Sequence, residues 1–92
     1  MKFVLNTCWG GFKVSDIAAK ALGLRDGWEA DDLDRNDPDL VKVVETLGKD
    51  ANGDCAKLRV VEIPDNATDW EYDDYDGMES IIYVVDGKIY HV

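Results

Sequence analysis

The chain has 92 residues, of which 46% are hydrophobic, and a formal net charge of −10. This size and composition predict one globular domain covering residues 1–92, and the charge argues against direct binding to nucleic acid or to an anionic membrane. No apolar run has the length of a signal peptide or a membrane span, and two cysteines are too few for a disulfide framework. We therefore expect a cytoplasmic protein with reduced thiols.

The first part of the chain predicts a strand, a turn and a helix. Residues 1–6 form a short hydrophobic strand, and a turn follows at Gly10-Gly11. Ser15 is suited to begin a helix, because its hydroxyl oxygen can accept hydrogen bonds from the free N–H groups of the first turn. Gly23 is a plausible end for this helix.

A less regular segment and a clearer helix come next. Residues 25–36 have no clear periodicity and predict a loop with room for a short helical turn. The second helix starts with Asp37 as its cap and Pro38 in its first position, and it ends at Gly48. An apolar stripe along this helix indicates the face that packs on the core.

The second half of the chain predicts strands. Residues 57–63 and 67–72 give the first two, and residues 79–85 and 88–92 flank Asp86-Gly87. This dipeptide favours a type I′ turn, whose twist matches that of the flanking strands. We therefore predict an α+β fold with a small mixed or antiparallel sheet of about four to five strands, two helices on one face and a C-terminal β-hairpin.

A glycine-rich motif precedes the first helix and consists of Cys8, Trp9, Gly10, Gly11, Phe12 and Ser15. Backbone N–H groups in such a turn can bind phosphate, which would make the protein a small-ligand or nucleotide-binding module. No Lys-Ser/Thr pair follows, although a P-loop requires one. The simpler interpretation is that the glycines reverse the chain while Cys8 and Phe12 pack in the core.

The sequence offers few residues for nucleophilic catalysis. His91 is the only histidine, so a hydrolase would need it beside Cys8, Cys55, Ser15 or Ser80. The sequence leaves open a meeting of Cys8 and His91 on adjacent strands, but no surrounding signature supports one. We predict no catalytic residue, and the sequence favours a protein that is not an enzyme.

One acidic segment approaches the pattern of a calcium-binding loop. Asp50, Asn52 and Asp54 have its one-three-five spacing of oxygen ligands. The sixth position should be glycine but is Cys55, and the twelfth should be glutamate but is Val61. The segment is better explained as an Asn-Gly turn, so we predict no metal ion and no cofactor.

The strongest functional indication is the distribution of charge. No lysine or arginine occurs between Arg59 and Lys88, whereas acidic and aromatic residues are interleaved there. Aromatic rings within an acidic field suit a protein interface, because the rings supply contact area and the charges steer a basic partner. The alternatives are a solvated acidic face or carboxylates that imitate nucleic-acid phosphates. The predicted partner-binding residues are Asp69, Trp70, Glu71, Tyr72, Asp73, Asp74, Tyr75 and Asp76.

Several segments resemble a group of small, mostly uncharacterised proteins of phages and prophage regions. The similarity lies in the opening strand with its Cys-aromatic-Gly-Gly-Phe-x-x-Ser motif and in residues 37–41, 51–53, 60–64, 70–72 and 75–77. The resemblance implies a phage or bacterial setting and assigns no activity to any residue. Together with the charge, it leads to the hypothesis of a small acidic interaction protein. This protein would bind a basic surface of a host protein or nucleic-acid-handling complex, as an inhibitor of host defence.

Overall fold

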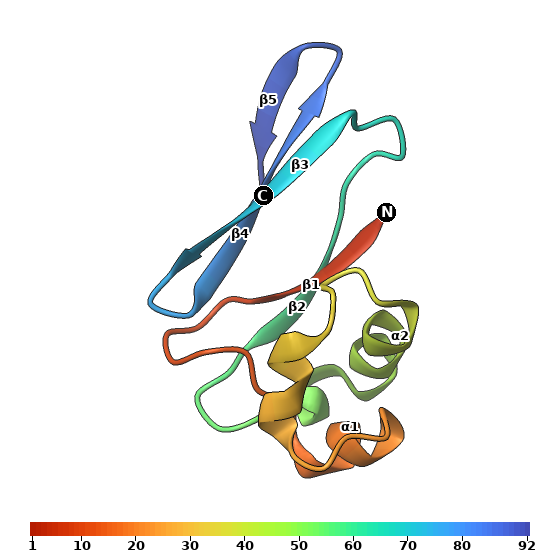
Figure 1. The fold of residues 1–92 in the computed structure, drawn as a ribbon, viewed down its shortest axis with the longest axis vertical. Helices are drawn as coiled ribbons and strands as arrows, with labels where there is room; N and C mark the ends of the chain where they lie inside the picture. The colour runs from red at the N-terminus through yellow and green to blue at the C-terminus, as the bar shows by residue number, and fades with distance from the viewer.

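In the computed structural model, which describes residues 1–92, the chain forms five strands, two α-helices and two short 3-10 helices (Figure 1). The strands are β1 (Lys2–Asn6), β2 (Leu58–Glu62), β3 (Asp69–Tyr75), β4 (Met78–Val85) and β5 (Lys88–His91). The helices are α1 (Asp16–Ala21), η1 (Gly27–Asp32), α2 (Pro38–Leu47) and η2 (Gly48–Ala51). None of these helices is long and apolar enough to cross a membrane.

The strands form two antiparallel sheets rather than one. β1 pairs with β2, and a second sheet has the order β3-β4-β5. The predicted α+β class and C-terminal hairpin are confirmed, whereas the single sheet of four to five strands is wrong. The outer edge of β1 is already occupied, which prevents the sheets from joining there. The Val4 N–H donates to the Arg35 carbonyl oxygen at 2.7 Å, and the Asn6 N–H donates to the Glu79 carboxylate at 3.2 Å.

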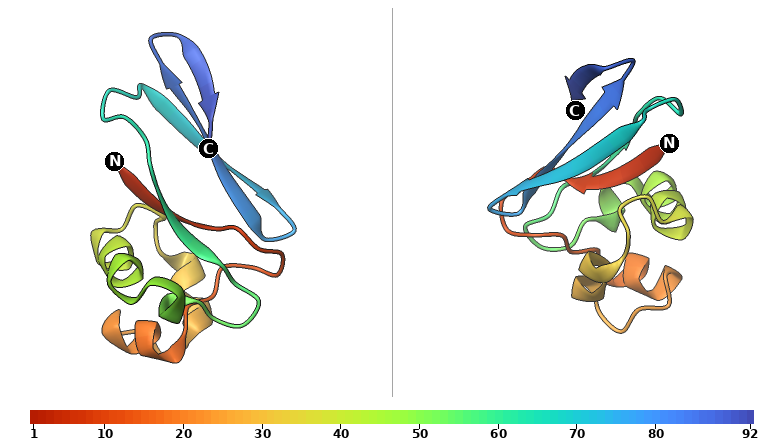
Figure 2. Two further views of the ribbon diagram at one scale, coloured as in Figure 1. Left: turned by 180° about the vertical axis from the view of Figure 1, so that it is seen from behind. Right: turned by 45° about the horizontal axis from the view of Figure 1, so that its top comes forward.

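The molecule has three layers, with the two-stranded sheet between the helices and the three-stranded sheet (Figures 1 and 2). Successive side chains of a strand point to opposite faces. Val4 of β1 therefore joins the hydrophobic cluster on the helix side, whereas Phe3 and Leu5 cluster with Ile81 of β4. The alternation within one short strand thus divides the core into two clusters.

Side-chain caps fix where the helices begin. The Ser15 hydroxyl accepts a hydrogen bond from the Ala18 N–H at the start of α1, and the Asp37 carboxylate accepts two from the first turn of α2. Asp26 caps η1 in the same way. Residues 25–36 therefore contain a short 3-10 helix, as the prediction of a loop with a helical turn allowed.

Two Asp-Gly turns shape the three-stranded sheet. Asp86 and Gly87 have φ angles of 51° and 75°, as the predicted type I′ turn between β4 and β5 requires. Asp76 and Gly77 have φ angles of 50° and 88° and form a second such turn between β3 and β4. The sequence analysis did not predict this second hairpin, and β3 consequently continues to Tyr75.

Candidate interaction surface

All the residues predicted to bind a partner are exposed. Asp69–Tyr75 form β3, in which every residue is exposed, and Asp76 is the first residue of the turn to β4. β3 is an edge strand, because it pairs only with β4. One hairpin thus brings all these side chains together, although not on one face.

The two faces of β3 differ in character. Trp70 and Tyr72 point towards the two-stranded sheet, and each ring meets the Phe3 ring edge-on with centroids 5.9 Å apart. Glu71 and Asp73 occupy alternate positions and point to the opposite face. From Trp70 to Asp73 the strand therefore alternates between aromatic rings towards Phe3 and carboxylates away from it, whereas Asp74 follows on the first face and Tyr75 on the second.

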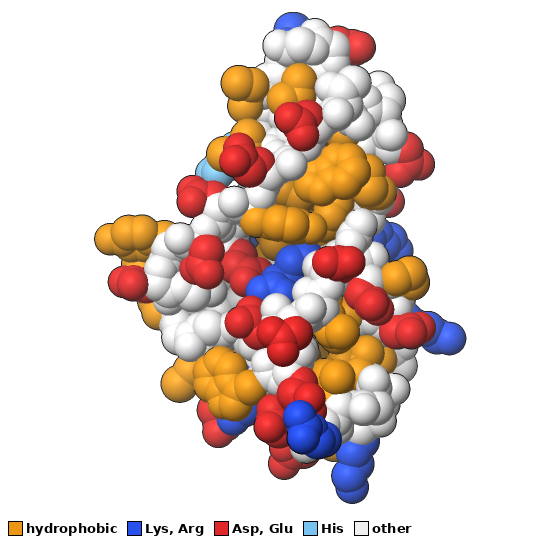
Figure 3. All heavy atoms as spheres, viewed as in Figure 1, with side chains coloured by type: hydrophobic (Ala, Val, Ile, Leu, Met, Phe, Trp, Pro, Cys, Tyr) orange, Lys and Arg blue, Asp and Glu red, His pale blue; other side chains and the backbone are white.

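A row of three aromatic rings crosses the sheet on the face towards Phe3. Trp70 lies opposite Tyr83, and Tyr83 lies opposite Tyr90. The rings of Tyr83 and Tyr90 stack with centroids 5.4 Å apart, and Trp70 and Tyr90 keep 37% and 43% of their surface exposed. Figure 3 shows hydrophobic side chains gathered over this sheet with acidic side chains around them. We call Trp70, Tyr83 and Tyr90 the aromatic row.

Sequence reasoning missed Tyr90, although the two turns contain the information needed to find it. A two-residue turn fixes the register of its hairpin. Asp86-Gly87 therefore sets Tyr90 opposite Tyr83, and Asp76-Gly77 sets Trp70 opposite Tyr83 from the other side. Both turns are needed to connect all three rings, and the sequence analysis predicted only the first.

A buried ion pair fastens one end of the sheet to the helical layer. Arg35 Nη2 lies 2.7 Å from Glu79 Oε2 and 2.8 Å from Asp31 Oδ1, and its guanidinium lies 3.8 Å from the centroid of the Phe12 ring. The side chains of Arg35 and Glu79 are only 13% and 9% exposed. Burial by itself lowers the pKa of Arg35, but the hydrogen bonds to Glu79 and Asp31 outweigh it and raise the pKa. The guanidinium therefore stays charged and paired.

A hollow of about 280 Å³ lies between Leu33–Arg35 and β3. Tyr72, Asp73, Asp74 and Glu79 complete its lining. Tyr72 keeps 45% of its surface exposed, and partial burial of the side chain raises the pKa of its hydroxyl against the opposing charge of Arg35. Because two carboxylates already neutralise Arg35, the hollow is acidic and offers no free cation to an anionic ligand.

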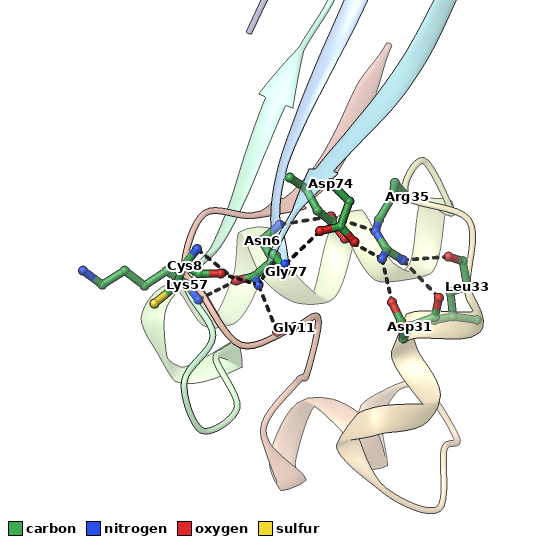
Figure 4. Close-up of polar contacts among 10 residues, drawn as sticks. Asn6, Cys8, Gly11, Asp31, Leu33, Arg35, Lys57, Asp74 and Gly77 are labelled. Carbon is green, nitrogen blue, oxygen red and sulfur yellow. Dashed lines mark hydrogen bonds and ion pairs between the residues drawn. The ribbon is translucent and has the colours of Figure 1, made fainter.

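The glycine-rich motif connects β1 to the β3–β4 turn (Figure 4). The Asn6 side chain is fully buried, and its Nδ2 lies 2.7–2.9 Å from the carbonyl oxygens of Cys8, Gly11 and Gly77. Its Oδ1 accepts hydrogen bonds from the N–H groups of Cys8 and Lys57. Asn6 therefore serves as the centre of a backbone network that holds the motif in place.

The other motif residues also make contacts within the chain. Gly10 donates its N–H to the Asp76 carbonyl oxygen at 3.1 Å, and the Trp9 ring lies 5.5 Å from that of Tyr75. Phe12 is buried beneath Arg35, whereas Cys8 is only partly buried. The turn is thus occupied by packing and hydrogen bonding inside the protein.

The residues considered for catalysis and metal binding do not converge. Cys8 follows β1, which pairs with β2, whereas His91 lies on β5, which pairs with β4, so these residues are not on adjacent strands. Cys8 and Cys55 are both unpaired. No group of three or more His, Cys, Asp or Glu side chains is arranged to hold a metal ion. In the segment that approaches the calcium pattern, Asn52 Oδ1 accepts a hydrogen bond from the Leu58 N–H.

Comparisons with known protein families, with curated proteins and with solved structures found no match. The geometry and charge of the three-stranded sheet are therefore the features on which a function can be based.

Proposed function

We propose that this protein is a non-enzymatic interaction protein that binds a basic surface of a protein partner through its three-stranded sheet. One observation carries the proposal: the aromatic row stays partly exposed on a sheet that has no lysine or arginine before Lys88. Large aromatic residues dominate the binding energy of many interfaces, whereas surrounding charges mainly raise the association rate. On β3, Trp70 would contribute to the binding energy from one face, and Glu71 and Asp73 would raise the association rate from the other.

The resemblance to phage and prophage proteins suggests where the partner is found. We place the partner in a bacterial host, among the basic proteins of nucleic-acid-handling or defence complexes. Binding to such a complex would make this protein an inhibitor, because it would cover a surface that normally meets the phosphate backbone. The net charge of −10 disfavours direct contact with the nucleic acid itself.

The test begins with affinity capture from a bacterial host lysate and continues with the binding kinetics of the purified partner. Tyr90→Ala removes a partly exposed ring that stacks on Tyr83, so this variant should fold normally. It should raise the dissociation rate, at a cost of about 2 kcal/mol in binding free energy. Trp28→Ala, which truncates an exposed ring on the helical side, is the matched control and should bind as the wild type does.

A second variant tests the charge. Glu71→Lys with Asp73→Lys should slow association at low salt, and the effect should shrink at physiological salt, where the Debye length is about 8 Å. Both residues are exposed and make no ion pair, so folding should be unaffected. Unchanged binding by both variants would show that the sheet is a solvated surface without a partner.

A further inference from the structure

The free edge of β3 carries backbone groups without partners. Because Asp76-Gly77 is a two-residue turn, Tyr75 and Met78 form the hydrogen-bonded pair that closes the hairpin. Hydrogen bonding to β4 then alternates along β3, so the N–H and C=O groups of Tyr72 and Asp74 point to the free edge. Neither residue makes a backbone hydrogen bond outside the sheet. At Trp70 the N–H donates to the carboxylate of its neighbour Asp69 at 2.9 Å, which marks the same edge.

The edge of β1 shows what a closed edge looks like in this protein. There the outward N–H groups of Val4 and Asn6 are bound by the Arg35 carbonyl and the Glu79 carboxylate. The chain thus covers one edge with specific contacts and leaves the edge of β3 uncovered. An open edge is a template for an added strand.

Charge indicates which strand fits. Asp69, Glu71 and Asp73 stand at every second position on one face of β3, and their neighbours on β4 are Val84, Ile82 and Ser80. None of these acids has a cation within ion-pair distance. A strand placed at the edge with Lys or Arg at alternate positions would set each cation beside a carboxylate, as favourable cross-strand pairs require. Its intervening side chains would lie on the other face, beside Trp70 and Tyr72.

We propose that β3 binds an extended segment of a partner, with basic and apolar residues in alternation, as a fourth strand of the sheet. The proposal rests on the proposed function and adds its binding mode. A second copy of this chain does not fit at this edge through its own β3, because like charges would lie opposite each other. The edge of β5 is shorter and contains Lys88 and His91 without an acid, so it does not attract a basic segment.

The experiment uses fluorescently labelled, end-blocked peptides of seven residues, the length of β3. One alternates valine with three lysines, and a second has the same composition with its lysines in one block. Two further peptides are N-methylated versions of the alternating peptide. One has its methyl groups on the amides along one edge of the strand, and the other has them on the amides along the opposite edge. Fluorescence anisotropy gives the affinities. The alternating peptide should bind roughly tenfold more tightly than the block peptide. Only one of the two methylated peptides should lose this gain in affinity, because the added strand pairs with β3 through a single edge.

Two protein variants and hydrogen exchange complete the test. Glu71→Lys with Asp73→Lys should weaken binding of the alternating peptide by roughly tenfold at low salt. Asp32→Lys with Asp50→Lys, which changes the net charge equally at exposed positions on the helical side, should have a much smaller effect. The amides of Tyr72 and Asp74 should exchange more slowly in the complex, whereas those of Ile89 and His91 should not change.

The outcomes separate the binding mode from the function. If both peptides bind equally and the Glu71/Asp73 variant weakens both, the acidic surface is real and strand addition is wrong. If exchange slows at β5 instead of β3, or if the alternating peptide does not bind, strand addition at β3 is overturned. If the Glu71/Asp73 variant binds both peptides as tightly as the wild type does, the proposed function and the binding mode both fail.

Discussion

An Asp-Gly turn joins neighbouring strands at each end of the three-stranded sheet, yet the two turns have different surroundings. At the Asp76-Gly77 end, Gly77 lies against the backbone of Gly10 and Gly11, and Glu79 pairs with Arg35. At the Asp86-Gly87 end, no heavy atom lies within 4 Å of the position that a Gly87 side chain would take, and all of β5 is exposed. One end docks the sheet onto the rest of the protein, and the other projects along the 41 Å long axis (Figure 1). The same type of turn therefore either attaches the sheet to the rest of the protein or extends into solvent, depending on what the rest of the chain packs against it.

Removal of the docking ion pair should have the largest effect. Glu79→Ala leaves Asp31 as the only carboxylate paired with the largely buried Arg35, and it leaves the Asn6 N–H without its acceptor. Breaking a buried pair from one side costs about 3–5 kcal/mol, and we expect a fall of this size in the free energy of unfolding. Chemical denaturation measures it. Glu71→Ala, at an exposed position of the same sheet, should change the value by less than about 0.5 kcal/mol. Equal effects of the two substitutions would mean that the ion pair does not hold the sheet in place.

Alanine at the two turn glycines gives an intermediate effect and tests the comparison most directly. Both residues have positive φ, so each substitution carries a backbone strain of about 1–2 kcal/mol. At Gly77 the new Cβ would also collide with the Gly11 backbone nitrogen, whereas at Gly87 it would meet open space. We expect Gly77→Ala to destabilise the protein by about 1–3 kcal/mol more than Gly87→Ala, the usual range for overpacking. Thermal and chemical unfolding of the two variants would reveal the difference, and its absence would contradict the docking of the first turn.

The titration of Tyr72 should give the smallest effect. Partial burial of the Tyr72 side chain raises its pKa above the ordinary value of 10.0. The unfolded chain then loses this proton first as the pH rises, so stability is unaffected below pH 10 and falls as the pH rises from there through the folded-state pKa. Ultraviolet absorbance titration of the wild type and of Tyr72→Phe isolates the Tyr72 step as a difference. A step at or below pH 10 would show that the hydroxyl is not desolvated.

The elements that follow from short-range patterns were predicted from the sequence. Ser15 and Asp37 cap helices because their side-chain oxygens bind N–H groups only a few residues away. Asp86-Gly87 forms its turn because both residues tolerate positive φ. The acidic and aromatic composition of residues 69–76 was equally plain, and the structure leaves all of these residues exposed.

The tertiary structure decided how these elements are joined, because that depends on contacts between residues far apart in the chain. Arg35 and Glu79, separated by 44 positions, close the outer edge of β1 through the Arg35 carbonyl oxygen and the Glu79 carboxylate, and no strand of the second sheet pairs there. Nothing in the local sequence of either residue distinguishes it from a solvated charge. The alternation along β3 already places Trp70 and Tyr72 on the face opposite Glu71 and Asp73, and only the contacts with Phe3 show that the face with the two rings turns inward. Local sequence determines conformations that a few neighbouring groups can stabilise, whereas burial and pairing between distant residues determine which edges and faces stay open to a partner.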